Sequence, residues 1–532
     1  MKFDLLIKGG KVLDGSGSDP ITADIGVNGD RIAAIGALGA ATAENILNAE
    51  NLHVSPGFID IHTHSDISAL YHPEQSSSVA MGVTTQVVGN CGLSPGFAIP
   101  ADIFAFEQRW VAPYGVRFDW KDFGGYLNRI EEQGIANNFL PLAGHNTLRK
   151  RVMGMAKRAP DKEESLAMQN LLQEALQSGV WGFSSGLEYI PSGYAKIEEM
   201  ITLCRMVKDA GGFYATHLRN EGDTLIESVQ EAITTAEGAG IPLQLSHHKA
   251  EGKPNWGKIN ITLDIVQKAR ERGLDVQMDQ YPYTAFMTSL YVQILPEHAQ
   301  GGTNEEMAER LRNSQYRSRL LTEMFSLHPH WRETSEWERI RIAVCRGRVE
   351  IQGKSLASLG KEAGIHPAEY ALQLLADTNG YVSAVNFAIS EEDIAQVMRF
   401  PYTSIGSDGV ATQPEGKMAE DQVHPRTYGT FTRVLGRYVR ELGVLTEAEA
   451  IHKMTGLPAA RLNLPDRGLL LPGSFADITL YSPELARDIA TFEKPHQYSQ
   501  GIAAVIVNGR IAFQNGTFTN ARAGKVLRRQ GA

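Results

Sequence analysis

The chain has 532 residues, 42% hydrophobic and 21% charged, with a formal net charge of −10. This length allows a large core together with a smaller domain, and the acidic balance argues against nucleic acid or an anionic membrane as the main partner. Because the start (MKFDLLIKGGKVLDG) lacks a signal-peptide pattern and no apolar run is long enough to span a membrane, we expect a cytoplasmic protein.

The two ends of the chain resemble each other. The start contains short β-branched runs, DLLIKGGKVLDG and IGVNGDRIAAIG, and the end contains ADITLYS and IAAVIVNGRIAFQNG. Asn28-Gly29 and Asn508-Gly509 are typical of tight type I′ hairpins. We therefore predict that residues 1–55 and 466–532 together form one small β-sandwich domain, into which the rest of the chain is inserted.

Residues 56–465 alternate between segments typical of strands and segments typical of helices. Many strand segments are apolar along their whole length, as expected when helices cover them. The predicted strands are 58–62, 83–89, 139–143, 180–184, 213–217, 242–246, 275–279 and 403–406, and the predicted helices include 197–210, 223–237, 261–272 and 391–400. This pattern predicts an α/β protein with a (β/α)8 TIM-type barrel, although 340–345 and 382–389 are also strand candidates.

The alternation stops between about residue 284 and residue 350. This segment is rich in charged and aromatic residues, among them Tyr291, Trp331 and Trp337. We predict an inserted helical segment that covers the barrel mouth like a lid.

Side chains able to bind a metal recur where predicted strands end. The carboxyl ends of the strands meet on one rim of such a barrel. GFIDIHTHSD ends the first strand with His62 and His64, whose side chains alternate onto the same face. The other strand-end candidates are Cys91 in GNCG, His217 in FYATH, His247 in LQLSHH and Asp408 in TSIGSD. Each has an ordinary structural explanation by itself, but together they predict a metal site.

The donor types indicate the metal and the reaction. Imidazole and thiolate favour zinc over magnesium or calcium. The three cysteines are odd in number and far apart, so a disulfide framework is not expected. Three protein ligands with one open position are typical of catalytic zinc, which lowers the pKa of water to about 7. With Asp408 taking a proton from the attacking water, the pattern predicts metal-assisted hydrolysis of a polarised carbonyl.

HTH, the single strand-end histidines and the final aspartate together resemble the amidohydrolase superfamily. Within it, GNCG, HLRNE, SHHK and GSDG followed by HPR are similar to the N-acyl-D-amino-acid deacylase (D-aminoacylase) family, over nearly the whole chain. The resemblance implies one tight zinc site held by Cys91, His217 and His247. It also implies a second, weaker metal position at His62 and His64 that Cys91 can bridge. Many amidohydrolases bridge two metals with a lysine on the fourth strand, whereas VWGFSSGLEY carries none; one metal or two stays open.

The resemblance also implies roles in catalysis and substrate binding. Asp408 would be the general base toward water and then the acid toward the leaving amine. Lys249 in SHHK, Tyr189 in GLEYIP and Arg426 in HPR would hold the α-carboxylate of a small N-acyl amino acid substrate, and a planar guanidinium suits a carboxylate. The segment VATQPEGKMAEDQV between GSDG and HPR is longer than the usual spacer, so Arg426 has to fold back over the site.

Several alternatives remain open at this stage. A cyclic-amide hydrolase of the dihydroorotase or hydantoinase type and a D-dipeptidase are rival enzymes, and a scaffold without activity is a rival from another class. Preference for the D-enantiomer rests on the resemblance alone, and the accepted side chain, the acyl group and the oligomeric state stay open. His145 and His248 are expected to have structural roles, and Asp66 is expected to support the histidine pair.

Overall fold

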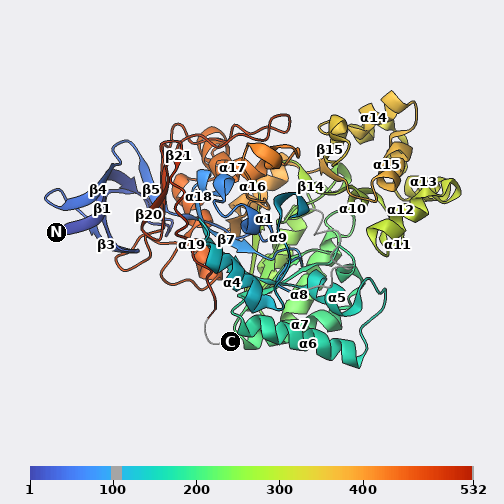
Figure 1. The fold of residues 1–532 in the computed structure, drawn as a ribbon, viewed down its shortest axis with the longest axis horizontal. Coiled ribbons are helices and arrows are strands. Elements are labelled where there is room, and N and C mark those ends of the chain that lie inside the picture. The colour runs from blue at the N-terminus through green and yellow to red at the C-terminus, as the bar shows by residue number, and fades with distance from the viewer. Residues whose placement is uncertain (98–110, 530–532) are drawn as a thin grey trace.

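The computed structural model describes residues 1–97 and 111–529. In Figure 1 the N-terminal strands lie at one end of the long axis and a mostly helical unit, from α10 (Leu290–Ile294) to α15 (Pro367–Asp377), lies at the other. Parallel strands and the helices around them occupy the middle of the molecule. The chain therefore has a distinct structural unit at each end of a central α/β region.

Strands from both ends of the chain form one nine-stranded sheet. β5 (His53–Pro56) pairs with β18 (Ile478–Tyr481), which places the two ends of the chain side by side. The buried face of this sheet is formed by apolar residues such as Leu5, Ile25 and Ile506. The other strands are β1 (Lys2–Val12), β2 (Ile21–Asn28), β3 (Arg31–Gly36), β4 (Thr42–Asn48), β19 (Ile502–Val507), β20 (Arg510–Gln514) and β21 (Thr517–Phe518).

The two predicted hairpins differ in where the loop falls. Asn508 and Gly509 form the two-residue loop between β19 and β20, both with positive φ, as predicted. In the first hairpin Asn28 instead pairs with Arg31, so the loop is Gly29-Asp30, one residue later than predicted. Asn28 stays in the strand because its Oδ1 accepts from the Asp4 N–H at 3.2 Å.

The central strands run parallel in two sheets. The first contains β6 (Phe58–Asp60), β7 (Val83–Val88) and β8 (Asn138–Pro141). The second has the order β17 (Thr403–Ile405), β13 (Val276–Gln280), β12 (Leu243–Leu245), β11 (Phe213–His217), β10 (Gly182–Gly186) and β9 (Ala143–Gly144). Every segment predicted as a strand of this region overlaps an observed strand, because each is an apolar run bounded by turn residues.

The two parallel sheets approach each other at both edges. β8 and β9 are separated by Leu142 alone. At the other edge Thr63, just after β6, forms a parallel bridge with Gly409, just after β17, and the Asp408 N–H donates to the His62 carbonyl at 2.8 Å. The strand ends that carry the histidine pair and Asp408 are therefore direct neighbours.

Amphipathic helices pack against these strands. In α7 (Ile197–Asp209) the buried residues Met200, Leu203, Cys204 and Val207 follow helical spacing, so Cys204 is a core thiol. The other helices of the region are α1 (Ser68–Tyr71), α2 (Ser76–Ala80), α4 (Phe123–Gln133), α5 (His145–Met153), α6 (Lys162–Gln177), α8 (Leu225–Ala239), α9 (Ile259–Glu271), α16 (Glu391–Arg399), α17 (Arg426–Arg433), α18 (Glu447–Met454) and α19 (Gly456–Arg461).

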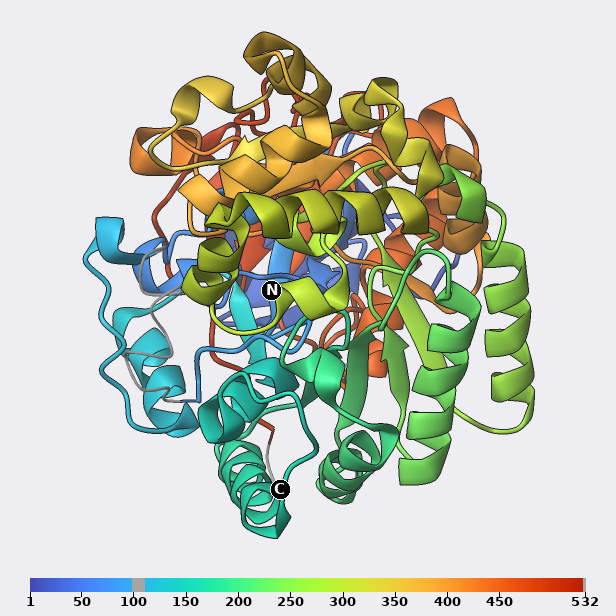
Figure 2. The same ribbon diagram turned by 90° about the vertical axis from the view of Figure 1, so that its right-hand side faces the viewer.

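The segment between β13 and α16 forms the helical unit at the far end. Its apolar cluster includes Trp331, Trp337 and Cys345 and continues to Ala384. Figure 2 shows its helices, in olive and yellow, crossing in front of the upper half of the molecule. The elements are β14 (Phe286–Ser289), α10 (Leu290–Ile294), α11 (Glu297–Gln300), α12 (Asn304–Arg312), α13 (Ser314–Leu327), β15 (Ile340–Val344), α14 (Leu356–Ala363), α15 (Pro367–Asp377) and β16 (Ser383–Asn386).

Among the described residues, the helices are all too short or too polar to cross a membrane.

Candidate active site

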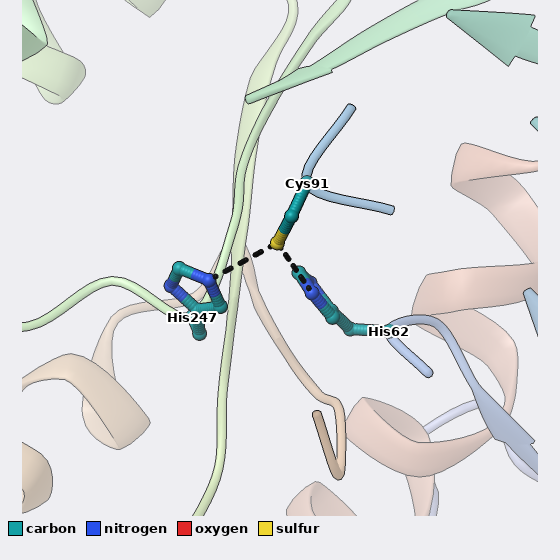
Figure 3. Close-up of side chains that lie close together, drawn as sticks. All are labelled: His62, Cys91 and His247. Carbon is teal, nitrogen blue, oxygen red and sulfur yellow. Dashed lines mark hydrogen bonds between the residues drawn. The ribbon is translucent and has the colours of Figure 1, made fainter. Parts of the chain in front are cut away.

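Three imidazoles surround the thiol of Cys91. The Cys91 Sγ lies 3.4 Å from Nε2 of His62 and 3.4 Å from Nε2 of His247 (Figure 3), and 3.9 Å from Nδ1 of His217. Nδ1 of His217 and Nε2 of His247 are 2.9 Å apart. Burial by itself would raise the pKa of the Cys91 thiol, but the charges of His62 and His247 hold that pKa well below its usual range. Four strand ends thus bring one thiolate and three ring nitrogens together.

Asp408 and His64 form a second group that shares His62. Oδ1 of Asp408 lies 3.1 Å from Nε2 of His64 and 3.6 Å from Nε2 of His62. Burial alone would raise the pKa of Asp408, but the charge of Arg426 and the nearby imidazoles hold it well below its usual range. The carboxyl group is therefore ionised at neutral pH, as a proton acceptor must be.

The backbone is unusual at three of these positions. Cys91, His247 and Asp408 have φ values of 52°, 35° and 50°, a region that residues other than glycine rarely adopt. Each follows the end of a parallel strand, where the chain turns into the loop above. Gly89, with φ of 83°, permits the turn before Cys91, since a Cβ there would lie 2.2 Å from the Leu142 carbonyl oxygen.

Three carboxylates contact the imidazole nitrogens that face away from Cys91. The pairs are His62 Nδ1 with Asp279 Oδ1 at 3.0 Å, His247 Nδ1 with Glu221 Oε1 at 3.1 Å, and His217 Nε2 with Glu188 Oε2 at 2.6 Å. None of the three has a role predicted from the sequence. Asp279 ends a predicted strand, so the rule applied to the strand-end histidines would have found it. Glu188 and Glu221 lie in loops, where no periodic pattern indicates which way a side chain points.

Of the supporting residues, His248 and His145 make contacts that fit the structural roles expected for them. Nε2 of His248 bonds to Thr262 Oγ1 at 2.8 Å, away from the thiol. His145 bonds to Ser192 and Glu199. Asp66 is buried, which raises the pKa of its carboxyl group to about 7 against the opposing charge of His64.

Lys249 and Arg426, expected to hold a substrate carboxylate, each contact a carboxylate of the protein. Nζ of Lys249 lies 2.5 Å from Oε2 of Glu221 and 2.9 Å from Nδ1 of His247. Nη1 of Arg426 lies 2.6 Å from Oδ2 of Asp408, so the longer spacer still returns this arginine to the site. Both cations are therefore neutralised in the absence of substrate.

One cavity of about 430 Å³ joins these residues. All residues predicted for the site except His62 line it: His64, Cys91, Tyr189, His217, His247, Lys249, Asp408 and Arg426. Other parts of its wall come from the helical unit, including Met287, Thr288 and Val292. The hydroxyl of Tyr189 lies 3.3 Å from that of Thr288. The cavity is therefore bounded both by the strand ends and by the inserted segment.

A sequence profile of the amidohydrolase family matches residues 45–513. The chain belongs to the amidohydrolase family. This amidohydrolase is 36% identical over 534 residues to the D-aminoacylase of Alcaligenes xylosoxydans xylosoxydans, an alignment that covers 100% of this chain and 98% of that relative. The full-length match confirms the predicted membership of the N-acyl-D-amino-acid deacylase (D-aminoacylase) family.

Solved structures agree with this family membership. A D-aminoacylase structure described by its binuclear metal centre has a TM-score of 0.84 to this amidohydrolase at 34% identity, covering 99% of this chain and 100% of that chain. The N-acyl-D-glutamate deacylase of Bordetella bronchiseptica, solved with zinc and a phosphonate that mimics the tetrahedral intermediate, has a TM-score of 0.83 at 33% identity, with 99% and 100% coverage. The observed α/β architecture is thus the one found in these deacylases.

The donor set of this amidohydrolase fits a zinc ion. In tetrahedral zinc coordination a sulfur and a nitrogen ligand lie about 3.6 Å apart, and two nitrogen ligands about 3.3 Å apart. The 3.4 and 3.9 Å separations of Cys91 from His247 and His217, and the 2.9 Å between the two imidazoles, approach these values. His62, His64 and Asp408 form a second group of potential ligands.

Proposed function

We propose that this protein is a zinc-dependent N-acyl-D-amino-acid deacylase, which hydrolyses the amide bond to release a D-amino acid and a carboxylate. The observation that carries the proposal is one cavity lined by Cys91, His217 and His247 together with the Asp408 carboxylate and the Arg426 guanidinium. Cys91, His217 and His247 would hold the tight zinc ion, and His62 and His64 a weaker second one. The relatives named above support both the reaction and the metal.

Zinc, when bound, would polarise the amide carbonyl and lower the pKa of water at the site. Asp408 would accept a proton from that water as its oxygen bonds to the amide carbon. The same carboxyl group would then give this proton to the amide nitrogen as the carbon–nitrogen bond breaks. Arg426, Lys249 and Tyr189 would bind the α-carboxylate and fix which carbonyl lies beside Cys91 and the imidazoles. The substrate carboxylate would compete with Asp408 and Glu221 for the two cations.

The same proposal extends to the architecture. We propose that the two parallel sheets close into a (β/α)8 barrel across residues 56–465, because their edges approach each other at Leu142 and at Thr63–Gly409. Residues 1–55 and 466–532 would form the β-sandwich domain. The inserted unit would cover the barrel mouth like a lid, from about residue 284 to the end of its apolar cluster at Ala384. The cytoplasmic location and the absence of nucleic-acid or membrane partners stay predictions.

The cyclic-amide alternative receives less support. The fourth parallel strand, β10 (Gly182–Gly186), reads GFSSG and carries no lysine to bridge two metals. A D-dipeptidase would need the same carboxylate-binding residues. Its substrate would differ from an N-acyl-D-amino acid only in the acyl group, which would be an amino acid.

The proposal is tested with zinc-loaded protein by measuring amine release from matched N-acetyl-D- and N-acetyl-L-amino acids and from a D-dipeptide, and by measuring the ring opening of a hydantoin separately. We expect release from the N-acetyl-D series alone, lost in both Cys91→Ala and Asp408→Asn. Zinc content separates the two variants: Cys91→Ala should lose zinc from the tight site, whereas Asp408→Asn should keep it. Ring opening of the hydantoin with inert N-acetyl substrates would overturn the proposal.

A further inference from the structure

Nδ1 of His247 has two neighbours with opposite chemical preferences. Oε1 of Glu221 lies 3.1 Å from this nitrogen, and an ionised carboxylate can only accept a hydrogen bond. Nζ of Lys249 lies 2.9 Å from the same nitrogen, and an ammonium group can only donate one. All three residues are no more than 4% exposed, so water does not take the place of either neighbour. The two contacts therefore compete for one nitrogen.

The outcome of this competition decides whether His247 can bind a metal. A neutral imidazole carries one proton, and only the nitrogen without it has a lone pair for a metal. If Lys249 donates to Nδ1, the proton sits on Nε2, the atom 3.4 Å from the Cys91 thiol, and blocks it. If Nδ1 donates to Glu221, Nε2 is free. Only the second arrangement makes His247 a metal ligand.

Glu221 is placed to enforce the second arrangement. Its other carboxylate oxygen, Oε2, lies 2.5 Å from Nζ of Lys249 and so offers the lysine a better acceptor than His247. One carboxylate thus holds the cation with one oxygen and the imidazole proton with the other. His62 and His217 have the analogous carboxylates Asp279 and Glu188, and among the described residues no ammonium group competes for the same nitrogen.

We infer that Glu221 is a positioning residue that keeps the Nε2 lone pair of His247 available for zinc by binding both Lys249 and the Nδ1 proton. This inference rests on the zinc site proposed above. It adds Glu221, which does not bind the metal itself but contacts the proposed metal ligand His247. It also gives Lys249 a second effect besides substrate binding: without Glu221, the ammonium group opposes metal binding, both through the tautomer and through its charge.

The test is the zinc dissociation constant of the full-length protein, stripped of metal and titrated in competition with a chromophoric chelator. We expect Glu221→Gln to bind zinc roughly 10- to 100-fold more weakly than the wild type, the range typical of lost partners of metal ligands. Adding Lys249→Met to that variant should restore zinc affinity, because the glutamine carbonyl can accept from Nδ1 once the ammonium group is gone. Lys249→Met alone should not weaken zinc binding, because Glu221 still accepts the Nδ1 proton of His247.

Glu251→Gln is the matched control. Glu251 lines the same cavity, but among the described residues the carboxylates in contact with the site histidines are those of other residues. Its substitution should leave zinc affinity unchanged, and the thermal unfolding of the metal-free proteins reports whether each variant is folded. If Glu221→Gln is too unstable, two double variants that leave no unpaired buried charge are compared: Glu221→Leu with Lys249→Met, which has no acceptor for the Nδ1 proton, should bind zinc more weakly than Glu221→Gln with Lys249→Met.

Wild-type zinc affinity in Glu221→Gln, or no recovery in the double variant, would overturn the inference. The readout is metal binding, so the inference and the proposed reaction fail separately. Weaker zinc binding in Glu221→Gln supports the role of Glu221 even where the wild-type protein hydrolyses no N-acyl-D-amino acid.

Discussion

Two carboxyl groups that line the same cavity differ in charge because their neighbours differ. Burial raises the pKa of Glu251 to about 8, and the negative charges of Glu188 and Glu221 add to this effect. The pKa of Asp408 is held well below its usual range by Arg426 and the imidazoles, against the effect of burial. At neutral pH Asp408 is ionised while Glu251 is protonated. Of these two carboxyl groups, Asp408 is therefore the one that fits the proposed role of general base.

The hydroxyl of Tyr189 provides a prediction for substrate binding. Removing one hydrogen bond to a charged group costs about 1.5 kcal/mol, so Tyr189→Phe should raise KM for N-acyl-D-amino acids roughly tenfold. We expect little change in kcat, because the α-carboxylate does not change during the reaction. Thr288→Val is the control, since it removes only the 3.3 Å contact between the two hydroxyl groups. Equal increases in KM for both variants would argue against a direct contact with substrate.

His72 provides a prediction for stability, away from the site. Its Nε2 accepts from the Ser76 N–H at 2.9 Å, so the ring is neutral in this contact. Burial lowers its pKa to about 4, against a value of about 6.5 in the unfolded chain. Between these values the unfolded state binds more protons, so the contribution of His72 is present above about pH 6.5 and is lost as the pH falls toward 4, by about 3 kcal/mol.

Urea unfolding of the wild type and His72→Gln at pH 7.5, 5.5 and 4.5 measures this contribution. Other groups titrate equally in both proteins, so the difference in unfolding free energy isolates His72. We expect the wild type to be the more stable at pH 7.5 and the difference to shrink as the pH falls. A difference independent of pH would contradict the assignment.

At the scale of elements, the loops after the parallel strands position the site. The Cys91 loop is the clearest case, because GNCG places a non-glycine residue at positive φ between two glycines that also have positive φ. Gly89 approaches the backbone of Leu142, and Gly92 approaches the backbone of Gly186. The thiol is therefore held by backbone packing between neighbouring strands.

Gly89→Ala tests this packing. A Cβ 2.2 Å from the Leu142 carbonyl oxygen forces the backbone to move, so we expect lower stability and weaker zinc binding, measured by urea unfolding and chelator competition. Gly240→Ala is the control: φ is 68° at the end of α8, but a Cβ meets no described atom within 4 Å. It should cost about 1–2 kcal/mol from the left-handed backbone alone and leave zinc binding unchanged. Equal zinc affinity in both variants would show that the loop adapts.

At the scale of the whole molecule, a buried polar network joins the terminal sheet to the central strands. Arg467 pairs with Asp477 and donates to Asn508 Oδ1 at 2.9 Å. Asp477 also accepts from Asn138 of β8 at 3.1 Å, and Asn508 donates to Asn138 at 2.8 Å. Residues from both units therefore satisfy one another, so the terminal sheet supports the strands that carry the site.

Arg467→Met should leave the Asp477 carboxylate buried without its cation. We expect a loss of about 3–5 kcal/mol in the free energy of unfolding, measured by urea denaturation. Lys2→Met is the control. It breaks the 3.5 Å ion pair between Lys2 and Glu44, whose side chains are 74% and 61% exposed respectively. Its loss should cost less than about 1 kcal/mol. Similar losses in the two variants would mean that Asn138 and Asn508 stabilise the carboxylate by themselves.

The sequence alone determined the strands of the central region and the residue types at their ends. Apolar runs and turn residues are local features, so the positions of His62, Cys91, His217, His247 and Asp408 at strand ends were readable from the chain. The rule that parallel strands expose their carboxyl ends on one side then predicted that these side chains meet.

Only the tertiary structure decided how these side chains meet. It determined which nitrogen of each imidazole faces the thiol, which carboxylate contacts the other nitrogen, and that Arg426 lies against Asp408. It also showed that the apolar cluster of the inserted unit continues to Ala384. These features depend on side-chain rotamers and on contacts between residues far apart in the chain, neither of which has a periodic signature in sequence.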